Sequence, residues 1–519
     1  MRRTLIALMI SLALLAGACS GSDTEPVVGG TEDTGGGAAD VDTAATFRYG
    51  DANGPSSFDP HRSTIGQDYR FFAPVYDRIV HQDAAGDFVA GLAESWEFSE
   101  DGLTLTFVIR EGATFHDGTT LDAAAIKANL DRGKTLEGSS VMADLADIES
   151  IEAPDATKLV LNLSQVNAIL PGLLSHRAGA IVSPAAFENP DLDIMPIGAG
   201  PYRVTEHQPD TKIVYERYED YWDADFEGPQ RIELTILADP TTRMNALRTD
   251  AVDATIIGGD QVGDAESNGF SIDSAPGLTY LVLYLNRTRA EFDDPLVRQA
   301  VNHAIDREAI VGAVLRGQGD PAAQPFPEGY FAYNEDYPGD YYEYDPDKAR
   351  GLLAEAGLPD GFEFDMLVTA LSTYTQAGEA VQAMLADVGI TANIRQVEAA
   401  QTADVYYAQQ DGDALVSQWG GRPDPQMTMD LQFSGNGFSN PGRHTTPEFE
   451  QLNLKAKTTL DQEERAQALR DEVVEIVEQA FQVPIAHDYS IFAFNDQVVQ
   501  FGRMVTGQPD FIHMGMAAE

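Results

Sequence analysis

Cysteine is almost absent from the chain: 519 residues contain a single one, Cys19. An internal disulfide is therefore excluded, because a disulfide joins two cysteines. Cys19 directly follows an apolar run at 5–15 and small residues at 16–18, and two arginines precede the run. A basic start, a short apolar stretch and small residues are typical of a secretory signal peptide, which we predict at 1–18. The apolar stretch is shorter than the roughly 18 residues that favour a membrane-spanning helix.

Positive charge is also scarce. The chain has 33 Lys and Arg against 83 Asp and Glu, which gives a net charge of −50. Nucleic-acid binding is therefore not expected, since it usually requires a basic patch. No second long apolar run follows residue 45, so the body of the protein is not expected to cross a membrane. The acidic residues are spread along the whole chain and predict a strongly solvated surface.

Motifs of catalysis are missing as well. The nine histidines form no H-E-x-x-H pattern, and G-x-S-x-G does not occur. The residues Gly-Lys-Thr at 133–135 resemble the end of a P-loop, but Ala128 stands where that motif requires glycine. The segment 223–228 imitates the start of a calcium loop, yet its twelfth position is Leu234, which has no carboxylate. We therefore expect no catalytic residues, no metal and no cofactor.

Residues 19–45 are rich in Gly, Ser, Thr, Asp and Glu and have almost nothing to bury. This composition predicts a flexible acidic linker. The sequence Ala-Gly-Ala-Cys at 16–19 resembles the lipobox of bacterial lipoproteins, in which the cysteine is acylated and becomes the N-terminus. Leucine is the preferred residue at the position that Ala16 occupies. We expect Cys19 to carry a lipid anchor; plain secretion with an incidental cysteine is the alternative.

The remaining residues alternate short β-like runs with amphipathic helices, which predicts α/β layers. About 475 residues exceed one ordinary core, so two or more lobes are expected. Residues 94–109 are predicted to form a hairpin that turns at Asp101-Gly102. Capping and periodicity predict helices after Asp294, Asp306 and Asp345 and at 461–481, and buried strands at 281–286 and 483–494.

Several stretches along residues 46–519 resemble a known family. They are SSFDPHRS (56–63), VYDRIV (75–80), 92–132, PIGAGPYRV (196–204), 292–311, 344–361 and 483–495. In this order they resemble the extracytoplasmic solute-binding proteins of family 5, which include the dipeptide-, oligopeptide- and nickel-binding components of ABC importers. Such proteins are commonly lipid-anchored beside their permease in monoderm bacteria, a use that fits Cys19.

The resemblance implies a type II periplasmic-binding-protein fold: two α/β lobes, joined by a hinge of two crossing strands, with a subdomain inserted in one lobe. The N-terminal lobe would take 46–282 and 488–519, the insertion about 80–195, and the second lobe 283–487. The two buried strands predicted above would be the crossings. Function would be capture of a ligand by hinge closure and docking on a permease.

The stretch SQWGGRPDPQ (417–426) resembles the part of the second lobe that faces the ligand. The resemblance implies ligand contacts from Trp419, Gly420, Gly421, Arg422 and Asp424. In the peptide binders of the family, an aspartate shortly after the tryptophan pairs with the α-amino group of the peptide, whereas here Arg422 stands at that place. An arginine would repel an ammonium group and suits a carboxylate or a phosphate.

Most of these assignments have a structural alternative. Arg422 and Asp424 would form a pair beside two prolines, or Asp424 would receive a cation or hold Arg422 in place. Trp419 would stack on the ligand or fill the core of the lobe. Phe58, at the end of a strand, and Tyr489, beside the second crossing, are expected to line the binding site.

The sequence therefore predicts a substrate-binding lipoprotein of an ABC importer, located outside the cytoplasm on the outer face of the cell membrane or in the periplasm. The predicted partners are a peptide or other small polar solute and the permease subunits, with the membrane contacted only through the lipid anchor. The protein is expected to be a monomer without enzymatic activity. A secreted hydrolase and a peptide receptor without a transport role are the alternatives on the same scaffold.

Overall fold

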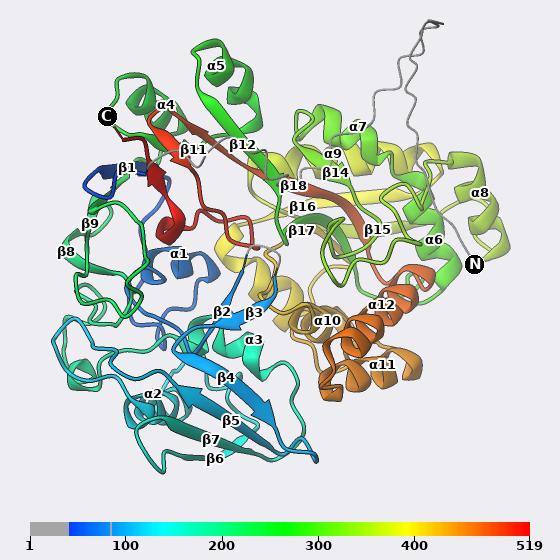
Figure 1. Cartoon of the computed structure of the whole chain (residues 1–519). Coiled ribbons are helices and arrows are strands. Elements are labelled where there is room, and N and C mark those ends of the chain that lie inside the picture. Colours follow the sequence, from blue (N-terminus) through cyan, green and yellow to red (C-terminus); the bar gives the residue numbers. More distant parts are fainter. Residues whose placement is uncertain (1–40, 84–85, 519) are drawn as a thin grey trace, which may run out of the picture. The chain divides into compact units, whose positions relative to one another are not determined.

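The computed structural model of the protein describes residues 41–83 and 86–518 (Figure 1). The predicted signal peptide and Cys19 lie outside the described residues. Among the helices described, none has both the length and the apolar character needed to cross a bilayer.

One long strand, β18 (Val483–Phe494), runs through both halves of the main sheet (Figure 1). The first half contains β1 (Thr46–Asp51), β8 (Tyr202–Gln208), β9 (Lys212–Arg217), β10 (Arg231–Ile236), β11 (Ala254–Ile256) and β12 (Ser271–Pro276). β1 lies parallel to β10 and β11, and its Phe47 and Tyr49 are buried in the core of this half. This half corresponds to the predicted N-terminal lobe.

The second half of the sheet contains β13 (Tyr280–Leu285), β14 (Gly319–Pro321), β15 (Glu363–Thr369), β16 (Thr391–Val397) and β17 (Ala414–Trp419). Every residue of β13 is buried, because alternate side chains pack in two core clusters, one with Leu281, Leu283 and Leu285 and one with Tyr280, Val282 and Tyr284. β17 and β18 pair with the two edges of this strand. β15 is parallel to β16, and α9 (Ser372–Asp387) makes the crossover between them, as parallel neighbours require.

A separate four-stranded antiparallel sheet lies within the predicted insertion (Figure 1). It consists of β4 (Ala93–Phe98), β5 (Thr104–Ile109), β6 (Ile148–Glu152) and β7 (Lys158–Leu163). The predicted hairpin at 94–109 is confirmed as β4 and β5. The neighbouring elements are β2 (Val80–Gln82), β3 (Phe88–Ala90), α2 (Ala123–Thr135) and α3 (Leu170–Leu174).

The helices confirm the predicted capping pattern. Asp294, Asp306 and Asp345 each accept a backbone N–H at the start of a helix. These helices are α6 (Pro295–Ala304), α7 (Arg307–Ala313) and α8 (Pro346–Glu355). The others are α1 (Tyr69–Phe72), α4 (Pro240–Arg248), α5 (Val262–Ser267), α10 (Pro425–Phe433), α11 (Pro447–Thr458) and α12 (Gln462–Glu478). α12 confirms the helix predicted at 461–481.

The chain passes between the two halves of the main sheet at two places. β12 pairs with the C-terminal part of β18, whereas β13 pairs with the N-terminal part of β18 and with β17. The segment 277–279 joins β12 to β13, and β18 pairs with strands of both halves. That the strands at 281–286 and 483–494 are the two crossings stays a prediction, and the segment 277–279 is called the first crossing below. The C-terminal strands β19 (Val498–Gln500) and β20 (Gly515–Met516) pair with each other, and Met516 packs in the core of the first half. The lobe limits given by the resemblance stay predictions.

Candidate functional site

Trp419 is the last residue of β17 and is only 5% exposed. Its backbone pairs with Tyr280 of β13. Its indole Nε1 donates a 3.1 Å hydrogen bond to Oγ1 of Thr428 on α10. The side chain therefore joins the strand to the helix, as the core-filling alternative expects, and stacking on a ligand stays a prediction.

Gly420 and Gly421 form the turn that leaves β17. Gly421 has a φ of +64°, and a Cβ there would lie 2.7 Å from the Cβ of Leu278, next to the first crossing. A side chain at this position would thus be strained and would also clash. Gly420 is exposed, and a Cβ on it would meet no heavy atom within 4 Å. The turn brings the following residue, Arg422, close to the crossing between the halves.

Arg422 is partly exposed, and its guanidinium lies 4.7 Å from the ring centroid of Trp419. One nitrogen donates a 2.7 Å hydrogen bond to the carbonyl oxygen of Gly421. Among the described residues, Arg422 has no further hydrogen bond and no ion pair with a carboxylate. Burial lowers its pKa, an effect that Tyr284 and Asp144 oppose. Most of its N–H donors therefore remain free for another group.

Asp424 has a different environment, although it is only two residues away. It is fully buried and caps α10 by accepting the backbone N–H of Gln426 at 2.8 Å. Its Oδ1 also accepts a 2.5 Å bond from the guanidinium of Arg465 on α12. The structural pair considered for Arg422 and Asp424 is therefore wrong, because Arg465 is the ion-pair partner of Asp424. A ligand contact from Asp424 stays a prediction, although its position is that of a packed helix cap.

The other two predicted residues lie apart from this segment. Phe58 is fully buried in the core of the N-terminal half, with its ring edge-on to His207 at 5.2 Å. Tyr489, on β18, donates a 2.6 Å hydrogen bond to Oδ1 of Asp320, the middle residue of β14. Burial raises the pKa of the Tyr489 phenol, so the group stays protonated. Neither side chain contacts Arg422, and their ligand roles stay predictions.

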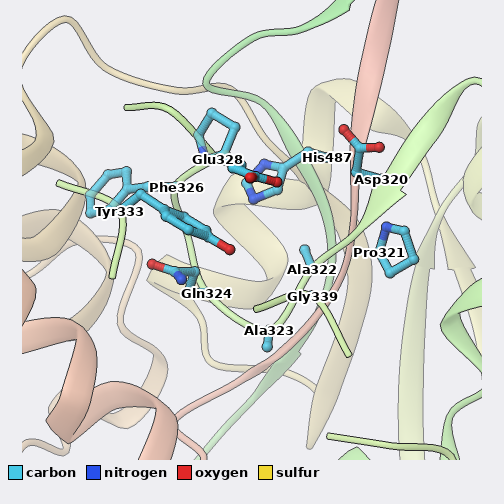
Figure 2. A pocket seen from close by; sticks show the side chains of 11 residues that line it. Asp320, Pro321, Ala322, Ala323, Gln324, Phe326, Glu328, Tyr333, Gly339 and His487 are labelled. Atoms are coloured by element: carbon cyan, nitrogen blue, oxygen red, sulfur yellow. The ribbon is translucent and has the colours of Figure 1, made fainter. Parts of the chain in front are cut away.

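Figure 2 shows a small cavity beside β14 and β18. Its volume is about 60 Å³, which suits a few water molecules and is too small for a peptide. Its walls come from Asp320, Pro321, Ala322, Ala323, Gln324, Phe326, Pro327, Glu328, Tyr333, Gly339 and His487. No residue predicted for the site lines it, and Tyr489 reaches it only through Asp320. We therefore do not place the solute there.

Two charged side chains that the sequence did not single out are electrostatically coupled to Arg422. Arg177, in the short 3₁₀ turn Arg177–Gly179, donates a 2.6 Å hydrogen bond to the carbonyl oxygen of Ile65, and its buried Nε has no partner. Asp144 lies in a turn before β6 and has neither a hydrogen bond nor an ion pair among the described residues. Burial raises the pKa of Asp144 to about 6, against the opposing effect of Arg177 and Arg422.

The segment that carries Arg422 contacts the predicted insertion directly. Nε2 of Gln82, on β2, donates a 2.8 Å hydrogen bond to the carbonyl oxygen of Pro423. Gly172, on α3, packs so tightly on Asp424 that an added Cβ would lie 3.1 Å from Oδ2 of Asp424. The segment after Trp419 thus contacts β2 and α3, and Asp144 and Arg177 are electrostatically coupled to Arg422 beside this contact. If the predicted domain limits hold, the three side chains lie at the junction of the predicted insertion and the predicted second lobe.

Sequence reasoning had no signal for Asp144 and Arg177. Both lie in irregular segments, and neither belongs to a motif. A metal centre is not apparent: within residues 41–83 and 86–518, no three His, Cys, Asp or Glu side chains gather as metal ligands. The chemistry of the junction is thus that of two guanidinium groups and one carboxylate with free hydrogen-bonding capacity.

Comparisons with known proteins agree with this architecture. The family described as "Bacterial extracellular solute-binding proteins, family 5 Middle" matches residues 87–440. Heme-binding protein A of Haemophilus influenzae is 28% identical over 507 residues, which cover 90% of this chain and 91% of that protein. The glutathione-binding protein GsiB of Escherichia coli O1:K1 / APEC is 35% identical over 318 residues, 60% of this chain and 62% of GsiB.

A solved structure extends the match to the fold. HbpA2 of Haemophilus parasuis superposes with a TM-score of 0.81 at 27% identity, covering 91% of this chain and 100% of HbpA2. The predicted two-lobe periplasmic-binding-protein fold is therefore confirmed. The relatives are named as binding proteins rather than enzymes. The chain belongs to the bacterial extracellular solute-binding proteins of family 5, which capture a substrate for the permease of an ABC importer.

Proposed function

We propose that the protein captures a peptide-like solute that bears an acid group and delivers this solute to its permease without altering it. Arg422 is the observation that supports the acid group most directly, because within residues 41–83 and 86–518 its guanidinium donates one hydrogen bond and has no carboxylate partner. Guanidinium groups bind carboxylates bidentately and strongly. The similarity to the glutathione-binding protein GsiB supports a peptide-like solute, since glutathione is a tripeptide.

The expected test is thermal unfolding of the full protein with a panel of solutes. The panel contains free-acid peptides, their C-terminal amides, dicarboxylates and oligosaccharides. A ligand at 100 times its Kd stabilises the folded state by about 2.7 kcal/mol and raises the midpoint by a few degrees. We expect this shift with free-acid peptides, and we expect Arg422→Gln to remove it. Stabilisation by amides that is equal to that by free acids, and unchanged in the variant, would refute the role of Arg422.

Catalysis is tested on the same samples. A solute that binds and is recovered chemically unchanged after prolonged incubation agrees with a receptor. Turnover, with loss of turnover in a single carboxylate or histidine variant, would favour the hydrolase alternative.

We further propose that Cys19 is acylated and that the mature protein works as a monomer on the outer face of the cell membrane. The order of an apolar run, small residues and one cysteine supports this proposal. Cys19→Ser is expected to move the protein from the membrane fraction to the soluble fraction. A mature protein whose mass shows no acyl chain on Cys19 would contradict it.

A further inference from the structure

Three charged side chains at the junction of the insertion and the second lobe lack direct charged partners. Arg177 and Arg422 each donate one hydrogen bond, in both cases to a main-chain carbonyl oxygen. Asp144 has neither a hydrogen bond nor an ion pair among the residues that the structure describes. All three are partly exposed, so a bound molecule can reach them.

We propose that Asp144, Arg177 and Arg422 form a charge template for a solute that carries two acid groups and one ammonium group. Arg177 holds one carboxylate from the side of the insertion, Arg422 holds the other from the second lobe, and Asp144 receives the ammonium group. This inference rests on the solute-capture function proposed above and names the class of solute. It adds Arg177 and Asp144 as residues that determine specificity.

Three of the other ionisable groups around the template are neutral. His176 stacks on Tyr69 with the ring centroids 3.7 Å apart, and burial lowers its pKa well below the ordinary value, so it is neutral. Burial raises the pKa of the phenols of Tyr284 and Tyr407, which are neutral as well. Asp68 faces Arg177 and is occupied by two serine hydroxyl groups.

One further cation, Arg78, is electrostatically coupled to His176. Its guanidinium donates to the carbonyl oxygen of Ala73 at 3.2 Å and lies 5.9 Å from the ring centroid of Tyr69. Arg78 is buried, so it is not counted among the exposed groups. The exposed groups thus carry two positive charges and one negative charge. A solute with two negative charges and one positive charge complements them.

Because the net charge of the protein is −50, the binding of an acidic solute depends on the local positive charges. A strongly acidic surface repels anionic solutes at long range, although salt screens that repulsion beyond about 10 Å. Binding of an acid therefore depends on local guanidinium groups whose own carboxylate partners are absent. A solute that meets both arginines also bridges two parts of the chain, so its binding favours the closed arrangement of the lobes.

The test is isothermal titration calorimetry on the full protein with matched probes. Glutathione and γ-Glu-Gly carry two carboxylates and one ammonium. Glutathione ethyl ester, blocked on the glycine, lacks one carboxylate; N-acetylglutathione lacks the ammonium; Ala-Ala-Gly has one carboxylate. We expect the ester, the acetylated form and Ala-Ala-Gly each to bind at least about tenfold more weakly than the parent peptides.

Variants assign each group. Affinity for glutathione should fall in both Arg177→Gln and Arg422→Gln. The preference for glutathione over its ester should vanish in only one of the two variants, the one that lacks the arginine bound to the glycine carboxylate, and the other variant should keep it. Asp144→Asn should remove the preference for glutathione over N-acetylglutathione alone. Arg177→Lys, which keeps the charge, should bind with intermediate affinity. The control is Arg203→Gln, an exposed arginine on β8, which should leave every affinity unchanged.

The outcomes separate the two proposals. If Ala-Ala-Gly binds as tightly as glutathione, or if both arginine variants keep the acid-over-ester preference, the charge template is refuted and the receptor function stands. If no peptide of any charge binds, the proposed function fails, and the template fails with it. Circular dichroism and the unfolding midpoint show whether each variant is folded before its affinity is compared.

Discussion

Two sets of arginines differ in how their donors are used. Arg298 and Arg307, in the core of the second lobe, are buried and each donates five hydrogen bonds, almost all to main-chain carbonyl oxygens. Burial lowers the pKa of both to about 10, so both stay charged at neutral pH. Arg177 and Arg422 are partly exposed and each donates one hydrogen bond.

The difference distinguishes arginines that stabilise the fold from arginines that are available to bind a ligand. A guanidinium whose three nitrogens all donate to oxygen atoms of the protein has become part of the fold, because removing it would leave several buried carbonyl oxygens unsatisfied. A guanidinium that donates one hydrogen bond to the protein has lost part of its hydration and has gained only that one partner in exchange. Such a group destabilises the empty protein slightly and gains its full set of bonds only with a ligand.

The largest expected effect concerns the first set. Arg307→Met removes five hydrogen bonds that join α7 to α6, to β18 and to neighbouring loops, so we expect the free energy of unfolding to fall by about 3–5 kcal/mol. Urea unfolding at pH 7 measures it. The control is Arg395→Met, an exposed arginine on β16, which should change stability by less than about 0.5 kcal/mol. A loss below about 1 kcal/mol for Arg307→Met would contradict the architectural role of saturated arginines.

A smaller effect should distinguish two neighbours in the sequence. Asp424→Asn keeps an acceptor for the cap of α10 but leaves the buried Arg465 without a negative partner, so stability should fall by about 2 kcal/mol. Arg422→Gln should change stability by less than about 1 kcal/mol, because only one hydrogen bond is lost. Thermal unfolding of the two variants in parallel measures both effects.

Calorimetry with glutathione measures the binding affinity of the same two variants, Arg422→Gln and Asp424→Asn. Affinity should fall at least about tenfold in Arg422→Gln and stay within about twofold in Asp424→Asn. If Asp424→Asn is stable but has lost affinity for glutathione, Asp424 contributes to ligand binding and the expectation is contradicted.

The sequence predicted much of the fold because the relevant signals are local. Caps at Asp294, Asp306 and Asp345 and the hairpin at Asp101-Gly102 depend on residues a few positions apart, and the structure confirms them. The same capping pattern occurs at Asp424. This residue also caps a helix and precedes a proline, as Asp294 and Asp345 do. Its buried pairing with Arg465 was not predictable, since α12 meets α10 only in the folded protein.

The candidate site was predicted in part. The family resemblance singled out Arg422, and the structure shows that this side chain has free donors. Asp144 and Arg177 were missed because each is an ordinary charged residue in an irregular segment, among 83 acidic and 33 basic residues. Their coupling to Arg422 depends on contacts between the insertion and the second lobe, such as that from Gln82, and no local pattern encodes such contacts.

The smallest expected effect concerns the cost of keeping Asp144 unpaired. Its pKa in the folded protein is about 6, above the ordinary value of about 4 for Asp, so the folded state binds the proton more tightly than the unfolded state. The resulting destabilisation is fully present above pH 6 and disappears as the pH falls through 6 to below about 4. In the ligand-free protein, Asp144→Asn should therefore raise the free energy of unfolding by about 1–2 kcal/mol at pH 7.5. At pH 4 the same substitution should raise the free energy of unfolding by almost nothing. Urea titrations at both pH values measure this difference, with Asp220→Asn as the exposed control. An equal gain at both pH values would show that Asp144 is not held as a lone carboxylate, because only an ionised group carries that cost.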